Sequence, residues 1–171
     1  MKNLVFIGMP AAGKSTIGVV IAKRLGYDFV DTDLLIQKEE GKLLRDIIAE
    51  RGLDGFLETE DRINAGVEAE KSVIAPGGSV VYCENAMRHY KEIGVIVYLK
   101  ASFETIKSRL GDTKSRGVVL RDNQTLKDLY DERTALFEKY ADITVCEDEL
   151  SLEEITGQII STLLDGGYVT I

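Results

Sequence analysis

The chain has 171 residues, of which 44% are hydrophobic and 29% charged, a composition typical of one soluble globular domain. Its net charge of −8 argues against a general nucleic-acid-binding protein, which needs a basic face. No stretch approaches the roughly 20 apolar residues of a membrane span, and Cys83 and Cys146 match no metal or redox spacing. We therefore expect one cytoplasmic domain over residues 1–171, with reduced thiols and with neither nucleic acid nor membrane as a partner.

A short apolar run at residues 3–7 precedes the segment GMPAAGKST at residues 8–16. From Gly8 to Ser15 the segment satisfies G-x-x-x-x-G-K-S, a loop that cradles nucleotide phosphates. An amphipathic helix follows, and Gly26 can end it; its apolar face is formed by Ile17, Val20, Ile21 and Leu25. Strand, loop and helix together favour this interpretation over an unremarkable glycine-rich turn, and they predict a site for a nucleoside triphosphate.

The residue types of this loop have defined uses around phosphate. Backbone N–H groups and the positive end of the helix attract the β-phosphate. The Lys14 ammonium can neutralise β- and γ-oxygens, and the Ser15 hydroxyl can bind Mg²⁺. Alanine is small enough for the loop, although it restricts the backbone more than glycine does. The predicted ATP-binding residues are Gly8, Ala11, Ala12, Gly13, Lys14, Ser15 and Thr16.

Four further apolar runs occupy residues 28–31, 72–75, 94–99 and 142–145, with helical spacing between them. Continuous apolar runs that alternate with helices predict an α/β fold whose parallel sheet is buried on both faces. Gly166 and Gly167 are expected to end the last helix, leaving residues 168–171 as a loose or docked tail.

The second run ends in Asp31-Thr32-Asp33, at the strand end that borders the nucleotide crevice in such folds. Two carboxylates at this spacing suit different tasks, one near Mg²⁺ and one near an acceptor hydroxyl. The alternative is that one aspartate only caps the helix that starts near Leu34.

An arginine lies within the apolar stripe of the helix predicted over about residues 124–140. Arg133 is four residues after Leu129 and four before Phe137, so it faces inward. An inward cation needs an anion, and we favour a bound ligand over an internal aspartate or glutamate.

A glutamate lies on an apolar helix face in the same way. Glu60 shares its face with Phe56, Ile63 and Val67, so its carboxylate either orients an arginine or a substrate hydroxyl, or reaches solvent.

The segment from Gly111 to Gly117 is polar, flanked by glycine and placed between two helices. Such a segment can close over phosphates and deliver the Arg116 guanidinium to developing charge. A solvated charged loop is the alternative.

These motifs, in their order and spacing, resemble the shikimate kinase family, P-loop kinases related in fold to nucleoside monophosphate kinases. GMPAAGKSTIG, DTD, GFLETE, APGGSVV, Arg116 and LYDERTALFEKYAD carry the resemblance over roughly residues 3–165. It implies a three-layer P-loop kinase fold with a five-stranded parallel sheet in the order 2-3-1-4-5. It also implies a substrate-binding helical segment over about residues 32–68 and a mobile lid over about 111–120.

The resemblance implies a monomer that uses ATP and Mg²⁺ to phosphorylate a hydroxyl of a small molecule, shikimate or a similar metabolite. Lys14, Asp33 and Arg116 would be catalytic, and Ser15 and Asp31 would hold the metal, Asp31 through water. Arg109 would pack against adenine, and Arg116 would also contact the nucleotide. The implied substrate-binding residues are Asp33, Glu60, Gly77, Gly78, Ser79 and Arg133.

Three positions depart from the family. Leu57 stands where the family has an arginine that shares the substrate carboxylate, Ser79 replaces a glycine, and Gly117 replaces a proline. Arg62 could supply the missing guanidinium from the next turn. Otherwise the acceptor is another hydroxy acid, a hydroxy amino acid or a nucleoside monophosphate, or the chain is a non-catalytic nucleotide-binding module.

Overall fold

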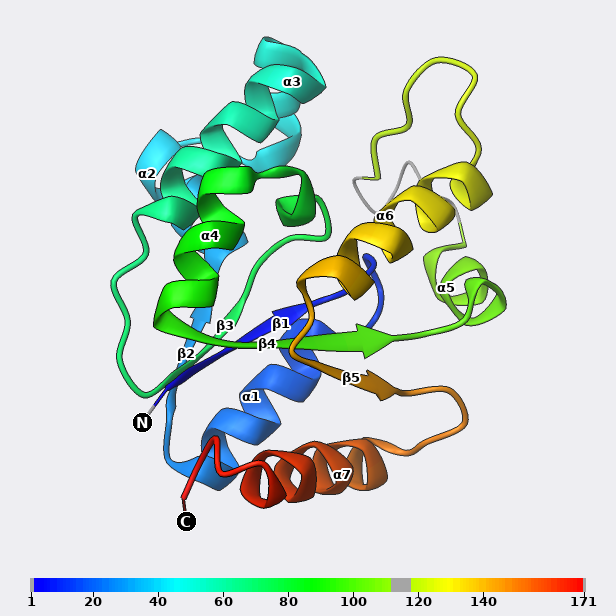
Figure 1. Ribbon diagram of the computed structural model, residues 1–171. Helices are drawn as coiled ribbons and strands as arrows, with labels where there is room; N and C mark the ends of the chain where they lie inside the picture. The colour runs from blue at the N-terminus through cyan, green and yellow to red at the C-terminus, as the bar shows by residue number, and fades with distance from the viewer. Residues whose placement is uncertain (1, 112–117, 171) are drawn as a thin grey trace.

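The computed structural model describes residues 2–111 and 118–170, so the predicted roles of Arg116 and Gly117 lie outside the described residues. Five parallel strands form one sheet in the order β2-β3-β1-β4-β5 (Figure 1), which confirms the predicted order. The strands are β1 (Asn3–Ile7), β2 (Asp28–Asp31), β3 (Ser72–Ala75), β4 (Gly94–Lys100) and β5 (Ile143–Cys146).

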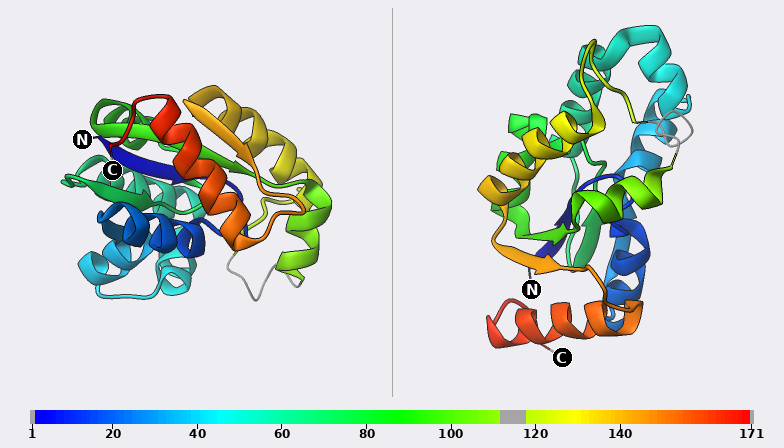
Figure 2. Two further views of the ribbon diagram at one scale, coloured as in Figure 1. Left: turned by 90° about the horizontal axis from the view of Figure 1, so that it is seen from below. Right: turned by 90° about the vertical axis from the view of Figure 1, so that its right-hand side faces the viewer.

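Helices cover both faces of this sheet and make it the middle of three layers (Figure 2). One face carries α1 (Lys14–Leu25) and α7 (Leu152–Asp165), and the other carries α4 (Glu84–Ile93) and α6 (Leu126–Tyr140). The remaining elements are α2 (Thr32–Glu40), α3 (Leu44–Ala65), the 3₁₀ turn η1 (Val80–Tyr82) and α5 (Phe103–Leu110).

The apolar run of β1 is continuous because each of its faces is buried under helices. Leu4 and Phe6 belong to the core formed with α1 and α7, whereas Val5 and Ile7 belong to the core on the other face. A third apolar cluster joins α2 to α3 through Ile36, Ile47, Phe56 and Ile63. The sheet and these cores hold the loop after β1 and the start of α2 in fixed positions.

The ends of several elements differ slightly from the predicted ranges, for local reasons. Helix α6 begins at Leu126 rather than near residue 124 because Thr125 and Asp128 form a capping box. Strand β5 begins one residue late because the Asp142 carboxylate accepts the Ile96 N–H, in the place of a backbone carbonyl. Gly26 ends α1 in a left-handed conformation, as expected.

The C-terminal tail is docked, because Val169 is 3% exposed and packs in the core beneath α1 and α7. Cys83 and Cys146 are both free thiols, as expected. Among the helices of residues 2–111 and 118–170, none is long and apolar enough to cross a membrane.

Candidate active site

The loop between β1 and α1 has a backbone that demands small residues. A Cβ at Gly8 would lie 2.8 Å from the Leu99 carbonyl oxygen, so β4 excludes any side chain there. Gly13 has a φ of 80°, and Ala11 adopts a φ of 67° in the left-handed region that favours glycine. Ala11 therefore stores backbone strain of about 1 kcal/mol inside the loop.

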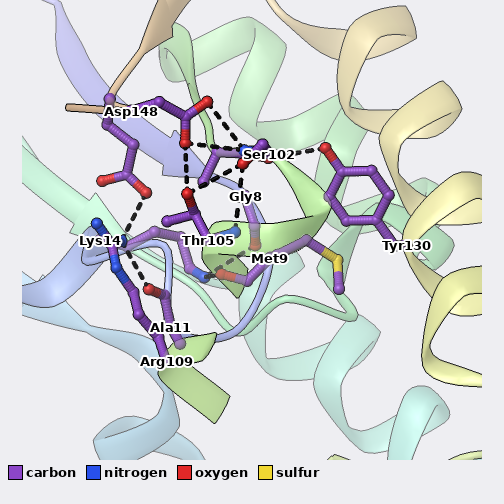
Figure 3. Close-up of polar contacts among 11 residues, drawn as sticks. Gly8, Met9, Ala11, Lys14, Ser102, Thr105, Arg109, Tyr130 and Asp148 are labelled. Atoms are coloured by element: carbon purple, nitrogen blue, oxygen red, sulfur yellow. Dashed lines mark hydrogen bonds and ion pairs between the residues drawn. The ribbon is translucent and has the colours of Figure 1, made fainter. Parts of the chain in front are cut away.

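Lys14 is folded into this loop. Its ammonium donates to the carbonyl oxygens of Gly8, at 2.8 Å, and Met9, at 2.9 Å (Figure 3). The residue is only 8% exposed, and burial lowers the pKa of the ammonium to about 8, although nearby Asp33 opposes that shift. The structure thus holds a cation at the position where phosphate oxygens would enter.

Arg109, in the last turn of α5, braces the outer side of the loop. Its guanidinium donates to the Ala11 carbonyl oxygen at 3.1 Å and to the Glu147 carboxylate at 2.8 Å (Figure 3). Sequence reasoning did not identify Glu147, a buried acid that follows β5; its place after a strand end was the only available signal. The predicted contact between Arg109 and adenine remains a prediction.

Asp31 caps α2, and its carboxylate also meets the Ser15 hydroxyl, whereas its role beside Mg²⁺ stays a prediction. One carboxylate oxygen accepts from the backbone N–H groups of Asp33 and Leu34, at 3.0 and 3.3 Å, and so caps α2. The other accepts from the Ser15 hydroxyl at 3.4 Å. A hydroxyl beside a carboxylate is the hard oxygen donor set that suits Mg²⁺. Within the described residues no cluster of three or more His, Cys, Asp or Glu side chains forms a metal site.

A cavity of about 380 Å³ lies in front of the loop, and residues from both halves of the predicted site line it. Of the predicted residues that the structure describes, Gly8, Ala12 and Arg109 are not part of its lining. Those that line it are Ala11, Gly13, Lys14, Ser15, Thr16, Asp31, Asp33, Glu60, Gly77, Gly78, Ser79 and Arg133. The structure therefore brings the nucleotide loop and the predicted acceptor residues to one space.

Arg133 and Glu60 are charged side chains buried at this cavity, 6% and 0% exposed. Neither takes part in any ion pair within the described part of the chain. The Arg133 guanidinium lies 5.5 Å from the centre of the Tyr82 ring, and its Nε has no hydrogen-bond partner there. The alternative in which the Glu60 side chain reaches solvent is therefore wrong. No described residue forms an internal salt bridge with Arg133.

The acidic groups of the cavity have raised pKa values. Burial raises the pKa of Asp33 to about 6, with a further contribution from Asp31 and opposition from Lys14. Burial likewise raises the pKa of Glu60 to about 7, against a hydrogen bond from Ser79 that lowers it. Both groups therefore change charge close to neutral pH, which suits residues that exchange protons or hydrogen bonds with a substrate.

Arg62 does not replace the arginine that the family has at position 57. Its guanidinium is bound by Glu39 and Glu40, at 2.5 and 2.6 Å, and its side chain is 56% exposed. Arg62 does not line the cavity, and Leu57 packs against the core instead. The suggestion that Arg62 approaches the substrate is wrong.

The turn after β3 approaches both halves of the site closely. A Cβ at Gly78 would lie 2.7 Å from Pro10 Cδ, in the phosphate loop. A Cβ at Gly77 would lie 3.0 Å from Asp33 Oδ1 and 3.1 Å from Glu60 Oε1. The turn therefore depends on glycine to let the loop and both carboxylates meet.

Substituting Gly77→Ala is expected to raise the KM for the acceptor about tenfold, because the methyl group displaces the Asp33 and Glu60 carboxylates. Affinity for ATP should stay within about twofold, since the three atoms nearest the added methyl group belong to Asp33 and Glu60 and not to the nucleotide loop. Steady-state kinetics with each substrate varied measures both. The matched control is Gly157→Ala, where the added methyl group meets nothing within 4 Å; an unchanged acceptor KM in Gly77→Ala contradicts this geometry.

The fold and the cavity together define a class of protein. A glycine-rich loop with its lysine and serine, set between the first strand and helix of a 2-3-1-4-5 parallel sheet, is the site of a P-loop kinase.

Comparison with known proteins narrows this class. A sequence profile described as shikimate kinase matches residues 10–164. The shikimate kinase of Thermodesulfovibrio yellowstonii is 37% identical over 163 residues, which is 94% of each chain. The structure of shikimate kinase from Acinetobacter baumannii in complex with shikimate has a TM-score of 0.86 at 26% identity, covering 97% of this chain and 94% of that one. For Aquifex aeolicus shikimate kinase the TM-score is 0.82 at 30% identity, covering 96% and 98%. The chain belongs to the shikimate kinase family.

Proposed function

We propose that the protein transfers the γ-phosphate of ATP to a hydroxyl of shikimate, forming shikimate 3-phosphate in aromatic amino-acid biosynthesis. The observation that carries the proposal is a single cavity lined by Lys14 of the phosphate loop, by the Asp33 and Glu60 carboxylates and by the Arg133 guanidinium. Shikimate is a polyhydroxy acid, so its hydroxyls suit the two carboxylates and its own carboxylate suits Arg133. The shikimate-bound relative from Acinetobacter baumannii supports the choice of acceptor.

In this proposal the residues of the chain have separate tasks. Lys14 and the N–H groups of the loop bind the β- and γ-phosphates, and Arg109 lies beside the adenine. Asp33 accepts a hydrogen bond from the attacking hydroxyl and takes its proton, which its raised pKa of about 6 favours. Ser15 and Asp31 would hold Mg²⁺, which supplies charge neutralisation at the phosphate oxygens. Arg116, which is outside the described residues, would add a second cation.

The proposal treats the chain as one kinase domain, a cytoplasmic monomer whose partner is its small-molecule substrate. Residues of about 32–68 would form its acceptor-binding segment and about 111–120 its lid. Packing of α2 on α3 through Ile36, Ile47 and Phe56, together with the cavity position of Glu60 on α3, supports the first assignment.

One observation favours a second candidate, a kinase of the same scaffold for another hydroxy acid or hydroxy amino acid. With Leu57 packed against the core and Arg62 bound by Glu39 and Glu40, a substrate carboxylate meets fewer guanidinium groups than in the family. The loss of one charged hydrogen bond corresponds to about 1.5–3 kcal/mol, or roughly ten- to a hundredfold in affinity. The missing guanidinium group therefore predicts either a higher KM for shikimate or a different acceptor.

ADP release in the presence of Mg²⁺ tests the proposal across acceptors: shikimate, homoserine, a sugar acid such as gluconate, and nucleoside monophosphates. We expect shikimate to give the highest kcat/KM. Higher kcat/KM with another hydroxy acid would replace shikimate by the second candidate. ATP binding without turnover on any acceptor would favour a non-catalytic nucleotide-binding module and contradict the proposal.

A further inference from the structure

Ser79, in the turn after β3, donates its hydroxyl to a buried carboxylate. The Ser79 Oγ donates to Glu60 Oε2 at 2.6 Å, a distance typical of a hydroxyl bound to an ionised carboxylate. Ser79 also precedes the turn η1, but its side chain makes no capping bond to that turn. The hydroxyl is therefore committed to Glu60 and not to the local backbone.

The hydrogen bond from Ser79 to Oε2 leaves the other Glu60 carboxylate oxygen to accept a hydrogen bond. Oε1, the other oxygen, is buried and has no hydrogen-bond partner within the described residues. The point where a Gly77 Cβ would stand is 3.1 Å from this oxygen and 3.0 Å from Asp33 Oδ1, so the two carboxylates flank the same small space. Glu60, Gly77 and Asp33 all line the cavity in front of the phosphate loop. With Oε2 held by Ser79, Oε1 is left to meet whatever binds beside Asp33.

We propose that Ser79 is a positioning residue of the acceptor site, whose hydroxyl fixes the Glu60 carboxylate so that Oε1 accepts a hydrogen bond from an acceptor hydroxyl. This inference rests on the proposed function, because it concerns how the same acceptor is recognised. Leu57, three residues before Glu60 on α3, offers that carboxylate no donor, and the hydroxyl of Ser79 in the turn after β3 holds it instead.

Several charged or titratable groups face Glu60 from the surrounding elements. They are Lys14 on α1, Asp33 on α2, Arg133 on α6, Cys83 just before α4, and Tyr90 on α4. Burial raises the pKa of Glu60 to about 7, and Asp33 adds to that rise, whereas the Ser79 bond, Arg133 and Lys14 favour the ionised form. Removing the Ser79 hydroxyl must therefore raise the Glu60 pKa further, because it removes a donor to the ionised form.

Ser79→Ala tests this without threatening the fold, because the backbone at Ser79, with φ −88° and ψ −6°, accepts alanine without strain. We expect the KM for shikimate to rise about tenfold or more, with a smaller fall in kcat, since a hydrogen bond to a charged group is lost. The acidic limb of the pH profile of kcat/KM should move to higher pH by about one unit. Ser79→Thr keeps the hydroxyl and should behave as the wild type does.

A second readout needs no substrate. The ¹³C resonance of the Glu60 carboxyl, assigned by its loss in Glu60→Gln, should titrate at higher pH in Ser79→Ala and unchanged in Ser79→Thr. The matched control is Cys83→Ala, which removes a weak thiol donor 3.9 Å from the same Glu60 oxygen and should leave the titration unchanged.

The two readouts also separate this inference from the proposed function. A Glu60 titration and a pH profile that are the same in Ser79→Ala as in the wild type would overturn the role of Ser79, as would a threonine variant that titrates like the alanine variant. If no acceptor is phosphorylated, the proposed function fails, whereas the NMR titration still decides whether Ser79 holds Glu60.

Discussion

Replacing Asp33 with asparagine is expected to remove nearly all phosphate transfer while leaving ATP binding largely intact. The Asp33 carboxylate lines the cavity, and no described residue donates a hydrogen bond to its side chain, so asparagine removes the charge and the proton acceptor without breaking a described contact. We expect kcat to fall by roughly 10³, the middle of the range for losing a positioned proton acceptor. Turnover is measured with saturating acceptor, and ATP affinity by calorimetry.

The same substitution should stabilise the fold. Burial raises the Asp33 pKa from its ordinary value of 3.8 to about 6, so ionisation favours the unfolded chain by an amount that grows between about pH 4 and pH 6 and is complete above it. Asp33→Asn should therefore raise the free energy of unfolding at pH 7 by roughly 2–3 kcal/mol. The gain should shrink as the pH falls through 6 and vanish below about pH 4, because the carboxyl is then neutral in both states.

The control for both effects is Asp28→Asn, at the exposed opposite end of the same strand β2. It should change neither turnover nor the pH dependence of unfolding. Asp33→Asn that keeps a tenth or more of the wild-type kcat would show that Asp33 is not the proton acceptor. A stability gain of the same size at pH 4 and pH 7 would show that its ionisation is not disfavoured by the fold.

Replacing Lys14 with methionine is expected to reduce kcat by roughly 10³ and to weaken ATP binding as well. The Lys14 ammonium is held inside the phosphate loop by the Gly8 and Met9 carbonyls. Without it, the described cavity wall keeps only the Arg45 and Arg133 guanidinium groups as cations, and neither belongs to the phosphate loop. Methionine fills a similar volume and avoids burying a cation, so the fold should persist.

Circular dichroism shows whether the Lys14→Met variant is folded. Single-turnover kinetics at several ATP concentrations measure the rate of transfer and the strength of ATP binding. Lys23→Met, on the exposed surface of the same helix α1, is the matched control and should retain full activity. A folded Lys14→Met protein with a tenth or more of the wild-type kcat would contradict the role given to Lys14.

The sequence predicted the scaffold well because local patterns determine it. The strand β1, the loop and α1 follow from an apolar run, a phosphate-loop pattern and an amphipathic helix, and the structure confirms all three. The burial of Arg133 and Glu60 was also predictable, since each falls within the apolar stripe of its own helix. Such inferences need only the spacing of apolar residues along a single helix or strand.

The contacts that the sequence did not predict join segments far apart in the chain. Arg62 was a candidate for the acceptor site, but α2 places Glu39 and Glu40 beside it, and no pattern within α3 indicates that. Glu147 meets Arg109 across 38 residues, and Ser79 meets Glu60 across 19. The sequence indicated that alanine restricts the loop backbone more than glycine does, but the left-handed conformation of Ala11 depends on how the loop closes between β1 and α1. Each of these depends on tertiary packing.

If one cavity joins a phosphate donor to an acceptor hydroxyl, ³¹P NMR of a reaction with Mg²⁺, ATP and shikimate will detect the transferred group. We expect a new phosphate monoester resonance, that of a phosphorylated shikimate hydroxyl, growing in proportion to ADP. ADP accompanied only by inorganic phosphate, or ATP that stays intact, would contradict it.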